Sequence, residues 1–74
     1  MNKLTLSKVY YTPKAVHMAA NAFKEICEIS IQETDDWIIC FFSMIIDIPV
    51  SLAIYEYENY LIDLIVSGDR HADN

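Results

Sequence analysis

Glycine and proline are scarce in this sequence, with one Gly and two Pro among 74 residues. Irregular connections usually depend on these residues, so we expect short loops between regular elements. Because Gly68 is the only glycine, the chain has no glycine-rich loop of the kind that binds phosphates.

The sequence also lacks a recognisable catalytic or metal-binding motif. Its two cysteines, Cys27 and Cys40, form no CxxC motif and lie among apolar neighbours, which predicts reduced thiols in a core. The other candidates, His17 and Asp47, fall on separate segments without a recognisable spacing. We therefore expect a protein that is not an enzyme and that binds neither a metal nor a cofactor.

Positive charge is nearly absent from residues 25–74. Before Glu25 the only charged residues are four lysines, whereas from Glu25 onward eleven acidic residues face Arg70 alone, for a net charge of −6. Nucleic acid is therefore not an expected ligand. The acidity either serves solubility or complements a basic partner, and both interpretations stay open.

Apolar residues are plentiful, at 54% of the sequence. A chain of this size buries only about 60% of the surface that its unfolded form exposes, so part of the apolar surface should meet a partner or a second copy. The segment from Met1 to Lys8 lacks the apolar core of a signal peptide, and we expect a cytoplasmic protein.

The run from Trp37 to Ile46 carries no charge and must be buried. Its isoleucines and aromatics, and the turn-like residues 33–36 before it, favour a strand over a helix. A membrane span over residues 37–55 has about the required length, but Asp47 and Pro49 would lie inside it. On those two costs we favour a buried strand over a membrane span.

The remaining pattern predicts four more elements. Residues 4–11 alternate as a first strand, and Thr12-Pro13 starts an amphipathic helix. Residues 27–33 switch to period two and should form a hairpin with the uncharged run. Residues 50–66 form a second helix, closed by Gly68. We expect one domain over residues 1–68 and a polar tail over residues 69–74.

This order predicts an α+β fold, β-α-β-β-α, with a three-stranded sheet and two helices on one face. A right-handed crossover through the first helix places the third strand between the first and second, as in a ferredoxin-like fold truncated before its last strand. Such a sheet leaves one face uncovered, where Trp37, Ile39 and Phe41 would lie. The second helix is apolar on its far side as well, at Leu52, Tyr55, Ile62 and Val66 around Asn59.

These surfaces predict binding to other chains. At least one of them should be buried in a homo-oligomer. No fourth strand follows the second helix within the 74 residues, so the first strand should have a free edge that an extended peptide could join. The same edge could instead pair with its own copy, and the sequence does not decide between the two. The residues expected to contact the partner are Val9, Tyr10, Tyr11, Trp37, Ile39, Phe41, Tyr55, Glu58 and Ile62.

Three segments resemble a known family. Val9-Tyr10-Tyr11-Thr12-Pro13-Lys14-Ala15-Val16, Ala22-Phe23-Lys24-Glu25-Ile26-Cys27 and Tyr55-Glu56-Tyr57-Glu58-Asn59-Tyr60-Leu61-Ile62-Asp63-Leu64 are similar to the opening and closing segments of HxsD-like proteins. These are small companions of radical-SAM enzymes in bacterial clusters that modify ribosomally made peptides. The resemblance implies a non-catalytic accessory role, with a precursor peptide, its radical-SAM enzyme or both as partners. The alternative is a small self-assembling protein without a peptide partner.

Overall fold

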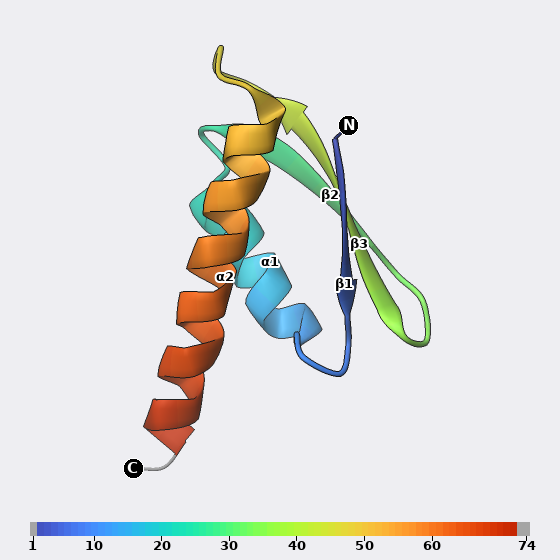
Figure 1. Ribbon diagram of the computed structural model, residues 1–74, viewed down its shortest axis with the longest axis vertical. Helices are drawn as coiled ribbons and strands as arrows, with labels where there is room; N and C mark the ends of the chain where they lie inside the picture. The colour runs from blue at the N-terminus through green and yellow to red at the C-terminus, as the bar shows by residue number, and fades with distance from the viewer. Residues whose placement is uncertain (1, 73–74) are drawn as a thin grey trace.

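The computed structural model describes residues 2–72, with side chains as far as Ser67, and it contains five elements in the predicted order (Figure 1). They are β1 (Lys3–Ser7), α1 (Pro13–Ala22), β2 (Cys27–Glu33), β3 (Trp37–Met44) and α2 (Val50–Ala72). Both helices lie on one side of the sheet and run in opposite directions. The α+β fold is therefore confirmed.

The sheet has the order β1-β3-β2, and both neighbouring pairs are antiparallel. Residues 37–44 of the uncharged run form the central strand, as predicted, whereas Ile45 and Ile46 follow the strand and are exposed. Cys40 lies opposite Leu4 on one side and opposite Ile31 on the other. In the part of the chain that the structure describes, no helix is both long enough and apolar enough to cross a membrane.

The two faces of β3 differ as its alternating side chains require. Ile38, Cys40 and Phe42 are buried beneath the helices, whereas the residues between them point to the uncovered face. The helices complete this core with small and medium side chains: Val16, Ala19, Ala53 and Leu61. The small side chains of Ala19 and Ala53 let the backbones of the two helices lie close to the sheet, so that even a small chain forms a close-packed core.

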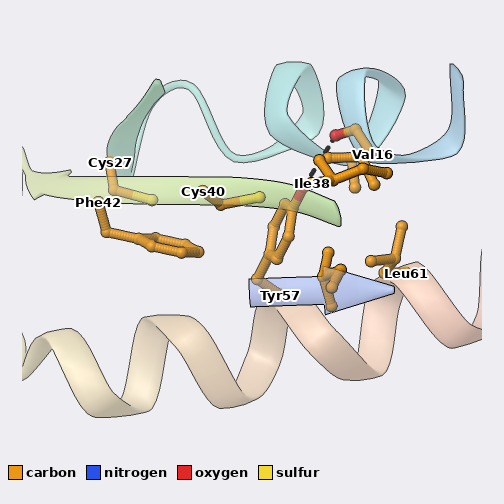
Figure 2. Close-up of a cluster of buried hydrophobic side chains, with 9 residues drawn as sticks. Val16, Cys27, Ile38, Cys40, Phe42, Tyr57 and Leu61 are labelled. Atoms are coloured by element: carbon orange, nitrogen blue, oxygen red, sulfur yellow. Dashed lines mark hydrogen bonds between the residues drawn. The ribbon is translucent and has the colours of Figure 1, made fainter. Parts of the chain in front are cut away.

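Tyr57 lies where α1, α2 and β3 meet (Figure 2). Its hydroxyl donates a hydrogen bond of 2.8 Å to the carbonyl oxygen of Val16. Its ring packs edge-to-face on Phe23 and on Phe42, with centroids 5.6 and 5.3 Å apart. Burying a tyrosine is stabilising only if its hydroxyl finds a partner, and the α1 backbone supplies that partner here.

The start of α1 follows from two adjacent residues. The Thr12 hydroxyl accepts a hydrogen bond from the Ala15 N–H at 3.2 Å, and Pro13 occupies the first turn, where no backbone donor is lost. The helix ends at Ala22, so Ile26 and Cys27 lie beyond it, although they continue its apolar spacing in the sequence. Cys27 instead begins β2, and its side chain still reaches the core.

Two predicted boundaries are wrong. The first strand ends at Ser7 and does not reach Tyr11, because Ser7 closes a turn: its hydroxyl accepts from the Val9 N–H at 3.1 Å and its carbonyl from the Tyr11 N–H at 3.0 Å. Gly68 does not end the second helix, which continues to Ala72. A glycine ends a helix only where it adopts a left-handed conformation, and inside a helix it costs about 1 kcal/mol. Residues 73 and 74 of the predicted tail lie outside the described part.

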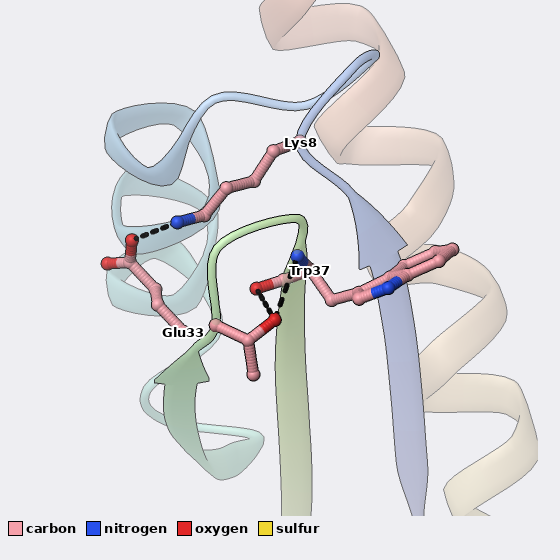
Figure 3. Close-up of polar contacts among 4 residues, drawn as sticks. Lys8, Glu33 and Trp37 are labelled. Carbon is pink, nitrogen blue, oxygen red and sulfur yellow. Dashed lines mark hydrogen bonds and ion pairs between the residues drawn. The ribbon is translucent and has the colours of Figure 1, made fainter.

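The β2–β3 hairpin is closed by hydrogen bonds between Thr34 and Trp37 (Figure 3). The Thr34 N–H donates to the Trp37 carbonyl at 2.9 Å, and the Trp37 N–H donates to the Thr34 hydroxyl at 3.1 Å. Beside this turn an ion pair of 3.1 Å joins Lys8, just after β1, to Glu33 at the end of β2. Both side chains are partly exposed, so the pair stabilises the fold by no more than about 1 kcal/mol.

Candidate functional site

The residues with catalytic potential are not brought together. His17 is exposed on α1, Asp47 is exposed in the segment before α2, and both thiols are buried under the helices. Among the residues whose positions are described, no three His, Cys, Asp or Glu side chains are grouped as metal ligands. Four surfaces lie outside the core: the outer edges of β1 and β2, the uncovered face of the sheet and the outer side of α2.

The buried thiols have a consequence for alkaline stability. Burial raises the pKa of Cys27 and of Cys40, although the Tyr57 hydroxyl partly offsets the rise at Cys40. Burial, and secondarily the neighbouring Cys40, also raises the pKa of Tyr57. Each group therefore keeps its proton in the folded state at a pH where the unfolded chain has lost it.

We expect the free energy of unfolding to fall as the pH rises above about 9, since the folded state then binds more protons than the unfolded state. Urea unfolding at a series of pH values measures this. In a Cys40→Ala variant the decline should be shallower, whatever its stability at neutral pH. A stability that stays level from about pH 8 to 10 would contradict the burial of these groups.

The first surface is the outer edge of β1. The Asn2 carbonyl accepts from the Phe42 N–H at 2.8 Å, and the Lys8 N–H donates to the Asp36 carbonyl at 2.9 Å. In an antiparallel ladder the backbone groups alternate between neighbours, so Lys3, Thr5 and Ser7 point away from β3. Within residues 2–72 no strand pairs with that edge. The edge carries unpaired donors and acceptors.

α2 lies over the β1 side of the sheet, and α1 lies over the β2 side (Figures 1 and 2). On α2, Tyr60 faces α1, because its ring is 5.8 Å from that of Phe23. The helical period then places Ile54, Glu58 and Ile65 on the opposite flank. All three are only partly buried. The flank of α2 that carries Ile54, Glu58 and Ile65 therefore lies above the outer edge of β1, and its side chains are still partly exposed.

The second surface, the outer edge of β2, was missed by the sequence analysis. There the backbone groups of Ile29, Ile31 and Glu33 point outward, because the bonds of the ladder fall on alternate residues: Thr34 bonds to Trp37, and Ile26 bonds to Ile45 just beyond β3. A shallow cleft of about 280 Å³ borders the start of this edge and is lined by Ala20, Asn21, Lys24, Cys27, Glu28, Ile29 and Ile45. The predicted strand order already implied this edge, because only the central strand of three has two neighbours.

The third surface is the uncovered sheet face. Trp37 is about half exposed, but Ile39 and Phe41 are shielded more than predicted. Their cross-strand neighbours are polar: Thr5 and Gln32 lie opposite Ile39, and Lys3 and Ser30 lie opposite Phe41. The face is a narrow apolar stripe between two polar rows.

The other predicted contact residues divide between two further places. Val9 and Tyr10 are 81% and 74% exposed in the turn after β1, while Tyr11 packs against the core. Tyr55 and Ile62 are exposed on the outer side of α2, the fourth surface. The predicted partner-binding residues thus do not form one site.

Comparisons with models of protein families, with curated proteins and with solved structures gave no match. The resemblance to HxsD-like proteins stays a prediction.

Proposed function

We propose that this protein is a non-catalytic adaptor that binds an extended peptide by strand addition to the outer edge of β1. The observation that carries the proposal is the outward-directed backbone of Lys3, Thr5 and Ser7, with no pairing strand within the described residues. Backbone pairing along a free edge provides affinity with little demand on sequence. The Ser7 carbonyl already accepts from Tyr10 and Tyr11, so Ser7 offers only its N–H.

The topology favours β1 over β2 as the docking edge. A right-handed connection through α2 would bring a strand parallel to β3 to the far side of β1, antiparallel to it. A peptide there takes the position of the strand that completes a ferredoxin-like sheet. Every second side chain would then lie below Ile54 and Ile65, with Glu58 nearby. The adaptor should prefer peptides with alternating apolar residues and one basic residue.

The resemblance suggests which peptide this is. In the proposal the ligand is a ribosomally made precursor peptide, which the adaptor holds for a radical-SAM enzyme. The similar segments include Glu58 on α2 and residues 9–16, which follow the docking edge directly. A gene for such an enzyme and one for a short peptide beside this gene would support the assignment. Self-assembly through the same edge is the alternative function.

A Thr5→Pro variant tests the edge. Proline removes the outward N–H of Thr5 and leaves the bonds between β1 and β3 in place, since those belong to Leu4 and Leu6. Peptides are first selected from a displayed library of random sequences on the wild-type protein. We expect the variant to bind them about tenfold more weakly or worse, because a backbone hydrogen bond is lost and the edge is blocked.

Two controls make the result specific. Thr5→Val keeps the N–H and the β-branched shape, so it should bind like the wild type. Glu33→Pro removes an outward N–H at the outer edge of β2, together with the weak ion pair to Lys8, and should also leave affinity unchanged. Unchanged binding by a folded Thr5→Pro variant would refute docking on β1, and a loss with Glu33→Pro would move the site to β2. A wild-type dimer that Thr5→Pro converts to monomers would favour self-pairing.

A further inference from the structure

A second binding surface follows the outer side of α2, opposite its core face. Four exposed apolar residues and one asparagine recur there at intervals of three and four residues: Leu52, Tyr55, Asn59, Ile62 and Val66. This is the a/d spacing of a coiled coil, and we call these five residues the outer seam. The four apolar side chains are between 43% and 61% exposed. The seam spans about 21 Å, or nearly four helical turns.

The core does not use this seam. Ala53, Tyr57 and Leu61 are the buried residues of α2, and they lie on the other side of the helix. A helix with apolar stripes on both sides has a second surface to bury. Asn59 stands in the middle of the seam at a position where coiled coils use asparagine to specify register and partner at some cost in stability.

The charges beside the seam identify the kind of partner. The positions that flank it include Glu56, Glu58 and Asp63, and residues 25–69 contain no lysine or arginine. In a parallel pair of identical helices Glu58 of one chain would meet Asp63 of the other. In an antiparallel pair one side of the seam would carry Glu56 and Asp63 of both copies. Like charges at these positions disfavour a second copy in either orientation.

From this pattern we infer that the outer seam binds one amphipathic helix of a different protein, with lysine or arginine beside its apolar stripe. The seam lies opposite Ala53, Tyr57 and Leu61, which pack α2 on the core, so this helix would not occupy the outer edge of β1. The partner helix should carry a polar residue opposite Asn59, because an apolar residue there would leave the amide without a hydrogen-bond partner.

The test uses two designed helical peptides with the same apolar stripe and one central asparagine. The basic peptide has lysine at the flanking positions, and the acidic peptide has glutamate. Calorimetry should show that the wild-type protein binds the basic peptide at least about tenfold more tightly than the acidic one, and that salt reduces this preference. In a Glu56→Lys/Asp63→Lys variant the preference should reverse.

A matched pair of substitutions locates the surface. Ile62→Glu places a charge in the seam, whereas Met18→Glu places one on an exposed apolar position of α1. Binding of the basic peptide should be lost in the first variant and kept in the second, with circular dichroism showing that both are folded. Equal binding of the two peptides, or binding that survives Ile62→Glu, overturns the inference. A wild-type dimer that only Ile62→Glu dissociates also overturns it, since the seam then holds a second copy.

Discussion

Replacing Tyr57 by alanine should lower the free energy of unfolding by about 3–5 kcal/mol. The ring is fully buried and packs on Phe23 and Phe42, so its removal opens a cavity at the meeting point of both helices and the central strand. A chain of this size has a total stability of only roughly 4–11 kcal/mol. The variant should therefore be largely or wholly unfolded near physiological temperature, as thermal unfolding followed by circular dichroism would show.

Tyr57→Phe separates packing from hydrogen bonding. It keeps the ring contacts and removes only the 2.8 Å hydrogen bond to the Val16 carbonyl, so we expect a loss of about 1 kcal/mol. Urea unfolding of the three proteins provides the comparison. If alanine and phenylalanine destabilise by similar amounts, the hydroxyl carries the effect and our account of the core is wrong.

Ile38→Asp should prevent folding, whereas Ile39→Asp should leave a folded protein. Ile38 is fully buried under the helices, where an unpaired carboxylate costs more than about 4 kcal/mol. Ile39 lies on the uncovered face between Thr5 and Gln32, where a charge remains in water and the expected loss is about 1 kcal/mol.

The dispersion of amide resonances in NMR spectra of the two variants distinguishes these outcomes. The substitutions are chemically identical and one residue apart, so a difference between them reports only on which face is covered. Two folded variants, or two unfolded ones, would contradict the one-sided arrangement of the helices.

The arrangement of the elements could be predicted from local patterns. The alternation at Ile29 and Ile31 indicates a half-buried strand, and the uncharged run from Trp37 indicates a buried one. The strand order then follows from the right-handed crossover through α1. These features depend on the side-chain period and on chirality, both of which act within a few residues.

The missed features depend on contacts that the sequence pattern does not contain. Val9 and Tyr11 are apolar and two residues apart, as in a strand, but the hydroxyl and carbonyl of Ser7 accept hydrogen bonds that fold the chain into a turn there. Tyr57 falls on the predicted core face, yet nothing in the helical period indicates that its hydroxyl reaches Val16, 41 residues away. The predicted contact residues belong to an expected strand edge and to expected exposed faces, which the fold places apart.

Hydrogen exchange of backbone amides tests the proposed function most directly. It is measured by NMR on the protein alone and with a peptide selected on the wild type. The amides of Lys3, Thr5 and Ser7 point outward in the free protein, and we expect their exchange to slow by about tenfold or more on binding. Leu4 and Leu6 bond to β3 in both states and should change little. Unchanged exchange at the three outward amides while the peptide is bound, or new protection at Ile29 and Ile31 instead, would contradict strand addition to β1.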